Sequence, residues 1–172
     1  FSGVWFEGGE CRILENRVAL VTGSTSGIGR ETTLGLLKNK IKVIVDNNHD
    51  LKRMKEISDS FNHDVEIMVR FTPGIECHTH EYIRTGSFDS KFGFGIESLG
   101  RLFEVISKTK HIKLTGLHAH IGSQIFELDP HNDLGKIMVN VLLQAKKFGH
   151  NIKELNVGGG LGIKYTEEDD PP

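Results

Sequence analysis

The fold is decided by one stretch of sequence, Ile112-Lys113-Leu114-Thr115-Gly116-Leu117-His118-Ala119-His120-Ile121-Gly122-Ser123-Gln124. Its apolar residues predict a buried strand over residues 112–120, and the glycine and serine that follow indicate a turn. Apolar residues at helical spacing flank it, over residues 98–109 and 134–148. A strand between two helices is typical of βαβ units, which build a parallel sheet with right-handed crossovers.

The same alternation extends outward in both directions. Further strands are predicted over residues 17–22, 41–46, 65–70 and 152–157. Helices are predicted over residues 29–40 and after Asp50, which is placed to cap its helix. The sequence therefore predicts an α/β fold with about five parallel strands alternating with helices. Periodicity does not decide between an open sheet and an incomplete βα-barrel, and residues 76–95 predict a long loop.

Composition excludes several classes of protein. With 37% hydrophobic and 26% charged residues, the 172-residue chain is expected to form a globular domain with its own core. Its 21 Lys and Arg are balanced by 23 Asp and Glu, so we expect neither a nucleic acid nor an anionic membrane surface as the main partner. Two cysteines, Cys11 and Cys77, indicate a reducing compartment, and the expected location is cytoplasmic. No apolar run approaches the ~20 residues of a membrane span.

Glycine is the unusual count, with 20 residues, and the glycines cluster after predicted strands. The first cluster, Thr22-Gly23-Ser24-Thr25-Ser26-Gly27-Ile28-Gly29, follows a strand and opens a helix. In that context glycine lets the backbone approach a pyrophosphate at the helix N-terminus. Asp46, at the end of the next strand, is placed to bind a ribose hydroxyl.

This cluster resembles the cofactor loop of the short-chain dehydrogenase/reductase family, over residues 14–47. The resemblance implies that four residues face the pyrophosphate of NAD(P): Gly23, Gly27, Ile28 and Gly29. That family's catalytic Tyr-x-x-x-Lys is missing, because the fourth residue after Tyr82 is glycine and the fourth after Tyr165 is aspartate. The segment is therefore half of a dinucleotide site, or a Rossmann-type βα unit with a purely structural role.

A second group of polar residues follows the later strands. His118 and His120 alternate along one strand, so they point the same way, and a flat imidazole there can stack on another ring. Ser123 can donate a hydrogen bond to a phosphate, as can the backbone amides of Gly158, Gly159 and Gly160. These groups sit at the carboxyl ends of predicted strands, where parallel α/β proteins place their sites.

Residues 41–172 resemble the diaminopimelate decarboxylase family, pyridoxal-phosphate enzymes with a barrel of the alanine racemase type. The resemblance rests on collinear segments that include Val69-Arg70-Phe71-Thr72-Pro73-Gly74, the stretch quoted first, and Asn156-Val157-Gly158-Gly159-Gly160-Leu161-Gly162. It implies that His120 stacks on the cofactor ring, that Ser123 and the three glycines hold the phosphate, and that Arg70 contacts the cofactor. The implied reaction decarboxylates a small amino-acid substrate, meso-diaminopimelate, to lysine.

The lysine that carries the cofactor in that family lies in a Tyr-Ala-x-Lys-Ala-Asn type of strand, and this sequence has none. Pyridoxal-phosphate chemistry needs that lysine for its Schiff base, so little or no activity is expected of this chain alone. We interpret the chain as one composite domain with an irregular segment 1–16, a Rossmann-like unit 17–40 and a half-barrel 41–172. Such a chain is a chimera or a fragment with cut ends, and a non-catalytic protein that binds phosphate-containing ligands is the further alternative.

Two expectations concern metals and partners. His78, His80, His118 and His120 form two His-x-His pairs, but no cysteine or carboxylate at ligand spacing completes a site, so no metal centre is predicted. Exposed edges of a parallel sheet favour pairing with another chain, so a homo-oligomer is a further expectation.

Overall fold

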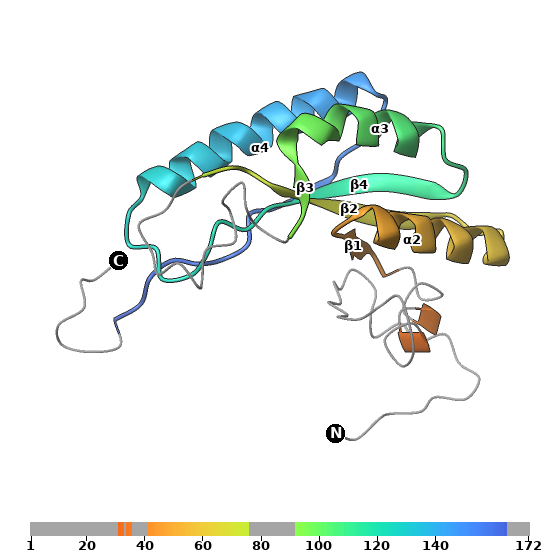
Figure 1. Cartoon of the computed structure of the whole chain (residues 1–172), viewed down its shortest axis with the longest axis horizontal. Coiled ribbons are helices and arrows are strands. Elements are labelled where there is room, and N and C mark those ends of the chain that lie inside the picture. The colour runs from red at the N-terminus through yellow and green to blue at the C-terminus, as the bar shows by residue number, and fades with distance from the viewer. Residues whose placement is uncertain (1–30, 33, 36–40, 76–91, 165–172) are drawn as a thin grey trace.

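The computed structural model describes residues 31–32, 34–35, 41–75 and 92–164 (Figure 1). Strands and helices alternate along these residues. Their order and bounds are β1 (Val43–Val45), α2 (Asn48–Phe61), β2 (Val65–Thr72), β3 (Phe94–Gly95), a 3-10 turn (Ile96–Ser98), α3 (Leu99–Ser107), β4 (Ile112–His118), α4 (Asp129–Lys147) and β5 (Glu154–Asn156).

The strands form one open, parallel sheet. Its order is β1-β2-β4-β5, and β3 pairs with the end of β2. The register places Arg70 of β2 opposite His118 of β4, and His118 opposite Asn156 of β5. The predicted α/β class and the parallel sheet are confirmed, and the carboxyl ends of three neighbouring strands lie level with one another.

The core lies between the sheet and its helices. Alternate residues of β2, from Val65 to Phe71, belong to one buried cluster that also contains residues of α2, α3 and α4. On α3 the buried face has the predicted helical spacing and consists of Leu99, Leu102, Phe103 and Ile106. Helices α3 and α4 lie side by side along the sheet (Figure 1). This packing covers one face of β2 and β4, and the opposite face carries the polar residues Glu66, Arg70 and His118 together with the buried Met68.

An irregularity in β4 decides which way its histidines point. Ile67 pairs with Leu114, but the next residue, Met68, pairs with Gly116, so Thr115 is an extra residue in the ladder. Such a bulge reverses the alternation of side chains beyond it. Ile112 and Leu114 are in the core before the bulge, and Leu117, Ala119 and Ile121 are in the core after it. His118 and His120 therefore lie on the same face of the sheet as Arg70. Without the bulge, simple alternation from Ile112 would place both histidines on the core face.

Ion pairs on that polar face show that the sheet is curved. Lys42, beside β1, is buried, and its Nζ lies 3.5 Å from Glu66 of β2 and 2.7 Å from Glu154 of β5. In a flat sheet β1 and β5 would be three strand spacings apart, about 14 Å. Side chains stand roughly perpendicular to a sheet, so in a flat sheet a lysine beside β1 and a glutamate on β5 would not meet across that gap. The sheet is thus bent toward its polar face at the amino ends of its strands, as a section of a barrel would be.

Several predicted boundaries were wrong for local reasons. Helix α2 is capped by Asn47, whose side chain accepts a hydrogen bond from the Asp50 N–H, so Asp50 lies in the first turn and is not the cap. Helix α4 begins at Asp129 rather than at residue 134, because Pro130 suits a first turn. Strand β3 lies within the predicted loop, and β5 is shorter than residues 152–157.

Some expectations fall outside the described residues. They include the strand predicted over residues 17–22 and most of the Rossmann-like unit 17–40, of which residues 31–32 and 34–35 are helical. Among the described residues no helix is both long and apolar enough to cross a membrane. All three residues of β5 are exposed at the edge of the sheet, and self-association through such an edge stays a prediction.

Candidate functional site

The polar residues predicted to act together meet at the carboxyl edge of the sheet. Arg70 lies near the end of β2, His118 ends β4, and His120 follows two residues later. The triple-glycine loop begins just after Asn156, the last residue of β5. Because the register sets these strand ends level, the structure brings together the predicted residues Arg70, His120, Gly158, Gly159 and Gly160.

Two loops at this edge are joined by hydrogen bonds. The Ile125 N–H donates to the Gly160 carbonyl (2.9 Å), and the Gly162 N–H donates to the Ile125 carbonyl (2.8 Å). The Gln124 side chain pairs with both backbone groups of Ile163, each at 3.0 Å. The turn after β4, which contains the exposed residue Ser123, therefore forms one rim with the loop after β5.

The glycines of this rim are required by the backbone. Gly158 and Gly160 have φ values of +74° and +111°, in the range that disfavours side chains. A Cβ on Gly160 would lie 1.9 Å from the Gly122 carbonyl oxygen, whereas one on Gly159 would have nothing within 4 Å. The cluster therefore brings the loop into close contact with the turn after β4.

The two histidines have different hydrogen-bonding roles. His118 Nδ1 lies 3.1 Å from the Asn156 carbonyl, so this nitrogen donates. His120 Nδ1 lies 3.4 Å from the Gly159 N–H and accepts its hydrogen bond, which assigns the proton of the neutral ring to Nε2. Burial lowers the pKa of His120 below its ordinary value, and the charges of Arg70 and His118 lower it further. The pKa of His118 is also lowered, mainly by burial. A neutral, planar His120 ring results.

The backbone amides of Gly158 and Gly159 are less available to a phosphate than the sequence suggested, because both already donate hydrogen bonds within the protein. The Gly158 N–H donates to the Asn156 side-chain oxygen (2.9 Å), and the Gly159 N–H donates to His120. The second of these bonds is long and therefore weak. The Gly159 amide is therefore the more easily released of the two. Asn156, which orients the loop, was missed by sequence reasoning, although its place at a strand end is a usable signal.

Asp46 has a different partner from the one predicted. Its Oδ1 lies 3.3 Å from Nη1 of Arg70, so it forms an ion pair within the protein, where the sequence had suggested a ribose hydroxyl as its partner. The Arg70 guanidinium carbon also lies 4.7 Å from the centre of the Phe92 ring. Phe92 lay in the predicted loop and nothing in its local sequence pointed to this contact.

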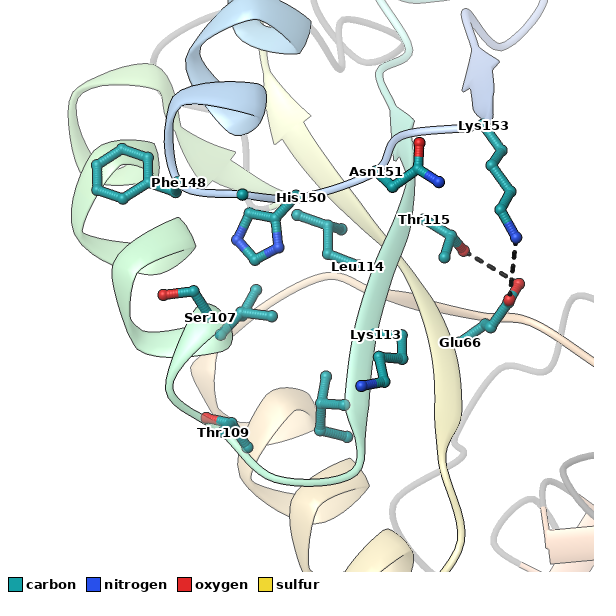
Figure 2. Close-up of a pocket in the computed structure, with 13 residues that line it drawn as sticks. Glu66, Ser107, Thr109, Lys113, Leu114, Thr115, Phe148, His150, Asn151 and Lys153 are labelled. Carbon is teal, nitrogen blue, oxygen red and sulfur yellow. Dashed lines mark hydrogen bonds and ion pairs between the residues drawn. The ribbon is translucent and has the colours of Figure 1, made fainter.

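A separate pocket opens at the opposite, amino end of β4 (Figure 2). It has a volume of about 400 Å³ and lies between β4, the turn after α3 and residues 148–153. On one side Glu66 accepts a hydrogen bond from Thr115 (3.2 Å) and pairs with Lys153 (3.7 Å). On the other, His150 Nε2 donates to the Phe103 carbonyl (2.8 Å). Each of these polar groups thus has a partner within the protein. None of the predicted site residues lines this pocket.

The remaining candidates cannot be placed. Gly23, Gly27, Ile28 and Gly29 lie outside the described residues, as do His78 and His80. Within the described part of the chain no three metal-binding side chains come together, and the expectation of no metal site stays a prediction.

Comparisons with known proteins identify the larger part of the chain. The family model described as "Pyridoxal-dependent decarboxylase, pyridoxal binding domain" matches residues 24–172. The diaminopimelate decarboxylase of Synechocystis is 52% identical over 130 residues, which are 76% of this chain and 28% of that protein. The enzyme of Bacillus subtilis is 37% identical over 142 residues, 75% of this chain and 30% of its own length. This chain thus spans about a third of the curated relatives it matches.

Solved structures agree on the fold. The crystal structure of diaminopimelate decarboxylase from Helicobacter pylori, complexed with L-lysine, superimposes with a TM-score of 0.75 at 30% identity. The superposition covers 84% of this chain and 36% of the Helicobacter pylori chain. The enzyme of M. jannaschii superimposes with a TM-score of 0.71 at 26% identity, over 83% of this chain and 34% of its own.

The dehydrogenase resemblance receives no support. The decarboxylase match begins at Ser24, inside the segment interpreted as a Rossmann-like unit, and the relatives named above are decarboxylases. The decarboxylase resemblance is confirmed, and it extends further toward the N-terminus than residue 41. By this match the chain belongs to the family of pyridoxal-dependent decarboxylases, within their pyridoxal-binding domain.

Proposed function

We propose that this chain supplies the carboxyl-edge wall of the pyridoxal-phosphate site of a diaminopimelate decarboxylase. One observation carries the proposal: Arg70, His120 and the loop Gly158–Gly160 come from three neighbouring strands and meet at one edge of the sheet. That edge is where parallel α/β proteins bind ligands. The family match and the identity of the relatives support the same assignment.

The residues at this edge suit pyridoxal phosphate. His120 is held through Nδ1 by the Gly159 N–H and is neutral, so its ring can lie flat against a pyridine ring without adding charge. Gly158 and Gly160 have backbone conformations that keep side chains out of the rim. Ser123 and the backbone amide of Gly160 are the donors we assign to the phosphate, beside the Gly159 amide that holds His120, and Arg70, the register partner of His118, supplies positive charge at the same edge.

When bound, pyridoxal phosphate withdraws electrons from a bond at the α-carbon of an amino acid. The role of this chain in that reaction is to bind and orient. Arg70 adds positive charge beside the two histidines, whose pKa values it lowers, and thereby favours an anionic ligand. The L-lysine bound by the Helicobacter pylori relative supports an amino-acid substrate with a long side chain, and we propose meso-diaminopimelate.

The buried lysine of the described residues does not supply the missing covalent link. Lys42 is the only buried lysine among them, and it pairs with Glu66 and Glu154 at the amino ends of the strands. It precedes Asp46 by four residues, about 13 Å along an extended strand. Its position is thus at the end of the sheet opposite to His120. We therefore propose that this chain alone binds the cofactor without a covalent bond and does not decarboxylate.

Titration of the 172-residue chain with pyridoxal phosphate tests this proposal. Absorbance and fluorescence are expected to show saturable binding, while borohydride treatment and mass spectrometry show no lysine adduct and meso-diaminopimelate releases no carbon dioxide. Arg70→Gln is expected to weaken binding about 10- to 100-fold, since a hydrogen bond to a charged group contributes about 1.5–3 kcal/mol. Arg101→Gln, an exposed change on α3, is the matched control and should bind as the parent chain does.

The outcomes separate the alternatives. Trapping of the cofactor on one lysine together with decarboxylation would show that the chain is a complete catalyst. Binding of NAD(P) in place of pyridoxal phosphate would restore the dehydrogenase interpretation. If both cofactors bind equally weakly and Arg70→Gln changes neither affinity, the chain has only a general affinity for phosphate groups.

A further inference from the structure

Arg70 is restrained by side chains from two other segments. Its own side chain is 19% exposed, and its Nη1 lies 3.3 Å from Oδ1 of Asp46, which directly follows β1. That oxygen is buried and accepts no hydrogen bond from any described residue. A buried carboxylate oxygen without a donor is costly unless a nearby charge compensates for it. The guanidinium of Arg70 is that charge, so the two side chains depend on each other.

The second restraint is an aromatic ring. The Arg70 guanidinium carbon lies 4.7 Å from the centre of the Phe92 ring, within the range of a cation–π contact. The segment that carries this ring is itself tied to β2, because the Thr72 hydroxyl donates to the Phe92 carbonyl. The planar guanidinium is therefore held by a carboxylate and by a ring whose backbone is anchored two residues away from Arg70.

This placement has a consequence for the histidines. Arg70 is the register partner of His118, and its charge lowers the pKa of both His118 and His120. His120 is influenced by Arg70 from β2 and by His118 from β4, and it accepts a hydrogen bond from the Gly159 amide after β5. Asp46 acts directly on His118, whose pKa it raises, but it is not among the causes of the shift of His120.

We propose that Asp46 is a positioning residue of this site: it holds the Arg70 guanidinium over Phe92 and beside the two histidines, and so sets the charge that a bound phosphate ligand meets. The role of Asp46 as an anchor stands on the contacts above, and its effect on the cofactor rests on the proposed function. A long arginine side chain loses conformational freedom when it is fixed in one position. An anchor that pays this cost during folding makes Arg70 ready to bind.

The test compares Asp46→Asn with the parent 172-residue chain by NMR titration of the His118 and His120 rings. If Asp46 positions Arg70, the variant frees the guanidinium, and the pKa of His120 rises toward its ordinary value of 6.5. If Asp46 acts only through its own charge, its removal leaves the pKa of His120 unchanged or lowers it, and the proposal fails. Asp59→Asn removes an exposed carboxylate paired with Lys55, and as the matched control it should leave both histidines unaffected.

A second variant tests the same point without a change of charge. Phe92 is 46% exposed, so Phe92→Leu is expected to fold, and it removes the ring on which Arg70 rests. The pKa of His120 should rise in this variant also, and an unchanged value in either variant would overturn the proposal. Asp46→Glu restores a carboxylate and should return the pKa of His120 toward that of the parent chain.

Pyridoxal-phosphate titrations of the same samples separate this inference from the proposed function. Asp46→Asn is expected to weaken binding about tenfold, a loss of about 1.4 kcal/mol. If the parent chain binds no pyridoxal phosphate, the proposed function fails, while the histidine titration still decides whether Asp46 positions Arg70. If the parent chain binds but Asp46→Asn leaves the affinity unchanged, the positioning role fails and the proposed function stands.

Discussion

Replacing Gly160 with alanine is expected to lower the free energy of unfolding by about 2 to 6 kcal/mol and to abolish measurable binding of pyridoxal phosphate. Gly160 has a φ of +111°, and a Cβ there would lie 1.9 Å from the Gly122 carbonyl oxygen. A side chain in such a conformation costs about 1–3 kcal/mol, and crowding against backbone adds a similar amount. The loop must move away from the turn after β4, which breaks the bond from the Ile125 N–H to the Gly160 carbonyl.

Gly159→Ala is the matched control for this prediction. It adds the same methyl group to the neighbouring residue, where nothing lies within 4 Å, so stability should stay close to that of the parent chain, while binding is compared only between Gly160→Ala and the parent chain, because Gly159 is itself part of the rim. Urea denaturation followed by circular dichroism measures the first quantity, and fluorescence titration measures the second. Equal effects of the two substitutions would show that the contact between the loops does not shape the site.

Phe103→Ala is expected to lower the free energy of unfolding by about 3–5 kcal/mol. Phe103 is completely buried on α3, and its ring contacts the rings of Phe148 and His150 at centroid distances of 6.4 and 5.8 Å. Its removal leaves a cavity at the junction of α3 with the end of α4. A loss of this size is a large part of the 5–15 kcal/mol that stabilises a typical domain, so a fraction of the chain would unfold at room temperature.

The control for the core is on the same helix. Val105 is 50% exposed, and Val105→Ala should change the free energy of unfolding by less than about 0.5 kcal/mol. Since Phe103 lies behind the sheet and far from the carboxyl-edge rim, the folded fraction of Phe103→Ala should bind pyridoxal phosphate with the affinity of the parent chain. A change in that affinity would mean that α3 shapes the site directly.

The helices and their buried faces could be predicted from the sequence, because periodic apolar residues such as Leu102 and Ile106 are a local signal. The face toward which the side chains of His118 and His120 point could not be predicted in the same local way. Both lie on one face, as their spacing predicted, but which face depends on the bulge at Thr115. A bulge arises from pairing with β2, and the residues of β4 alone do not reveal it.

The partners at the site were harder to predict than its position. Glycines and histidines at strand ends indicated the carboxyl edge, since topology fixes where parallel strands end. An acidic residue after a second strand suits a dinucleotide site, so the sequence predicts a ribose as the partner of Asp46. Its ion pair with Arg70 joins residues that are distant in sequence, and the contact of Arg70 with Phe92 bridges a further stretch of chain. Such contacts follow from the tertiary structure.

Two resemblances of unequal length had different outcomes. The Thr-Gly-x-x-x-Gly-Ile-Gly cluster covers a few residues whose chemistry, a turn before a helix, recurs in many α/β proteins. The decarboxylase resemblance runs collinearly through several strand ends, and the family match over residues 24–172 confirms it. Length and collinearity distinguish a family from a shared turn.

The central claim is that pyridoxal phosphate binds at the carboxyl edge of β4 and β5. Amide NMR spectra of the isotope-labelled chain, recorded during titration with pyridoxal phosphate, test it most directly. The account predicts saturable shifts at Ser123, Gly159 and Gly160 and at the rings of His118 and His120, with none around the amino-end pocket near Lys113 and His150. Shifts confined to that pocket, or none at the glycine loop at saturating cofactor, would contradict it.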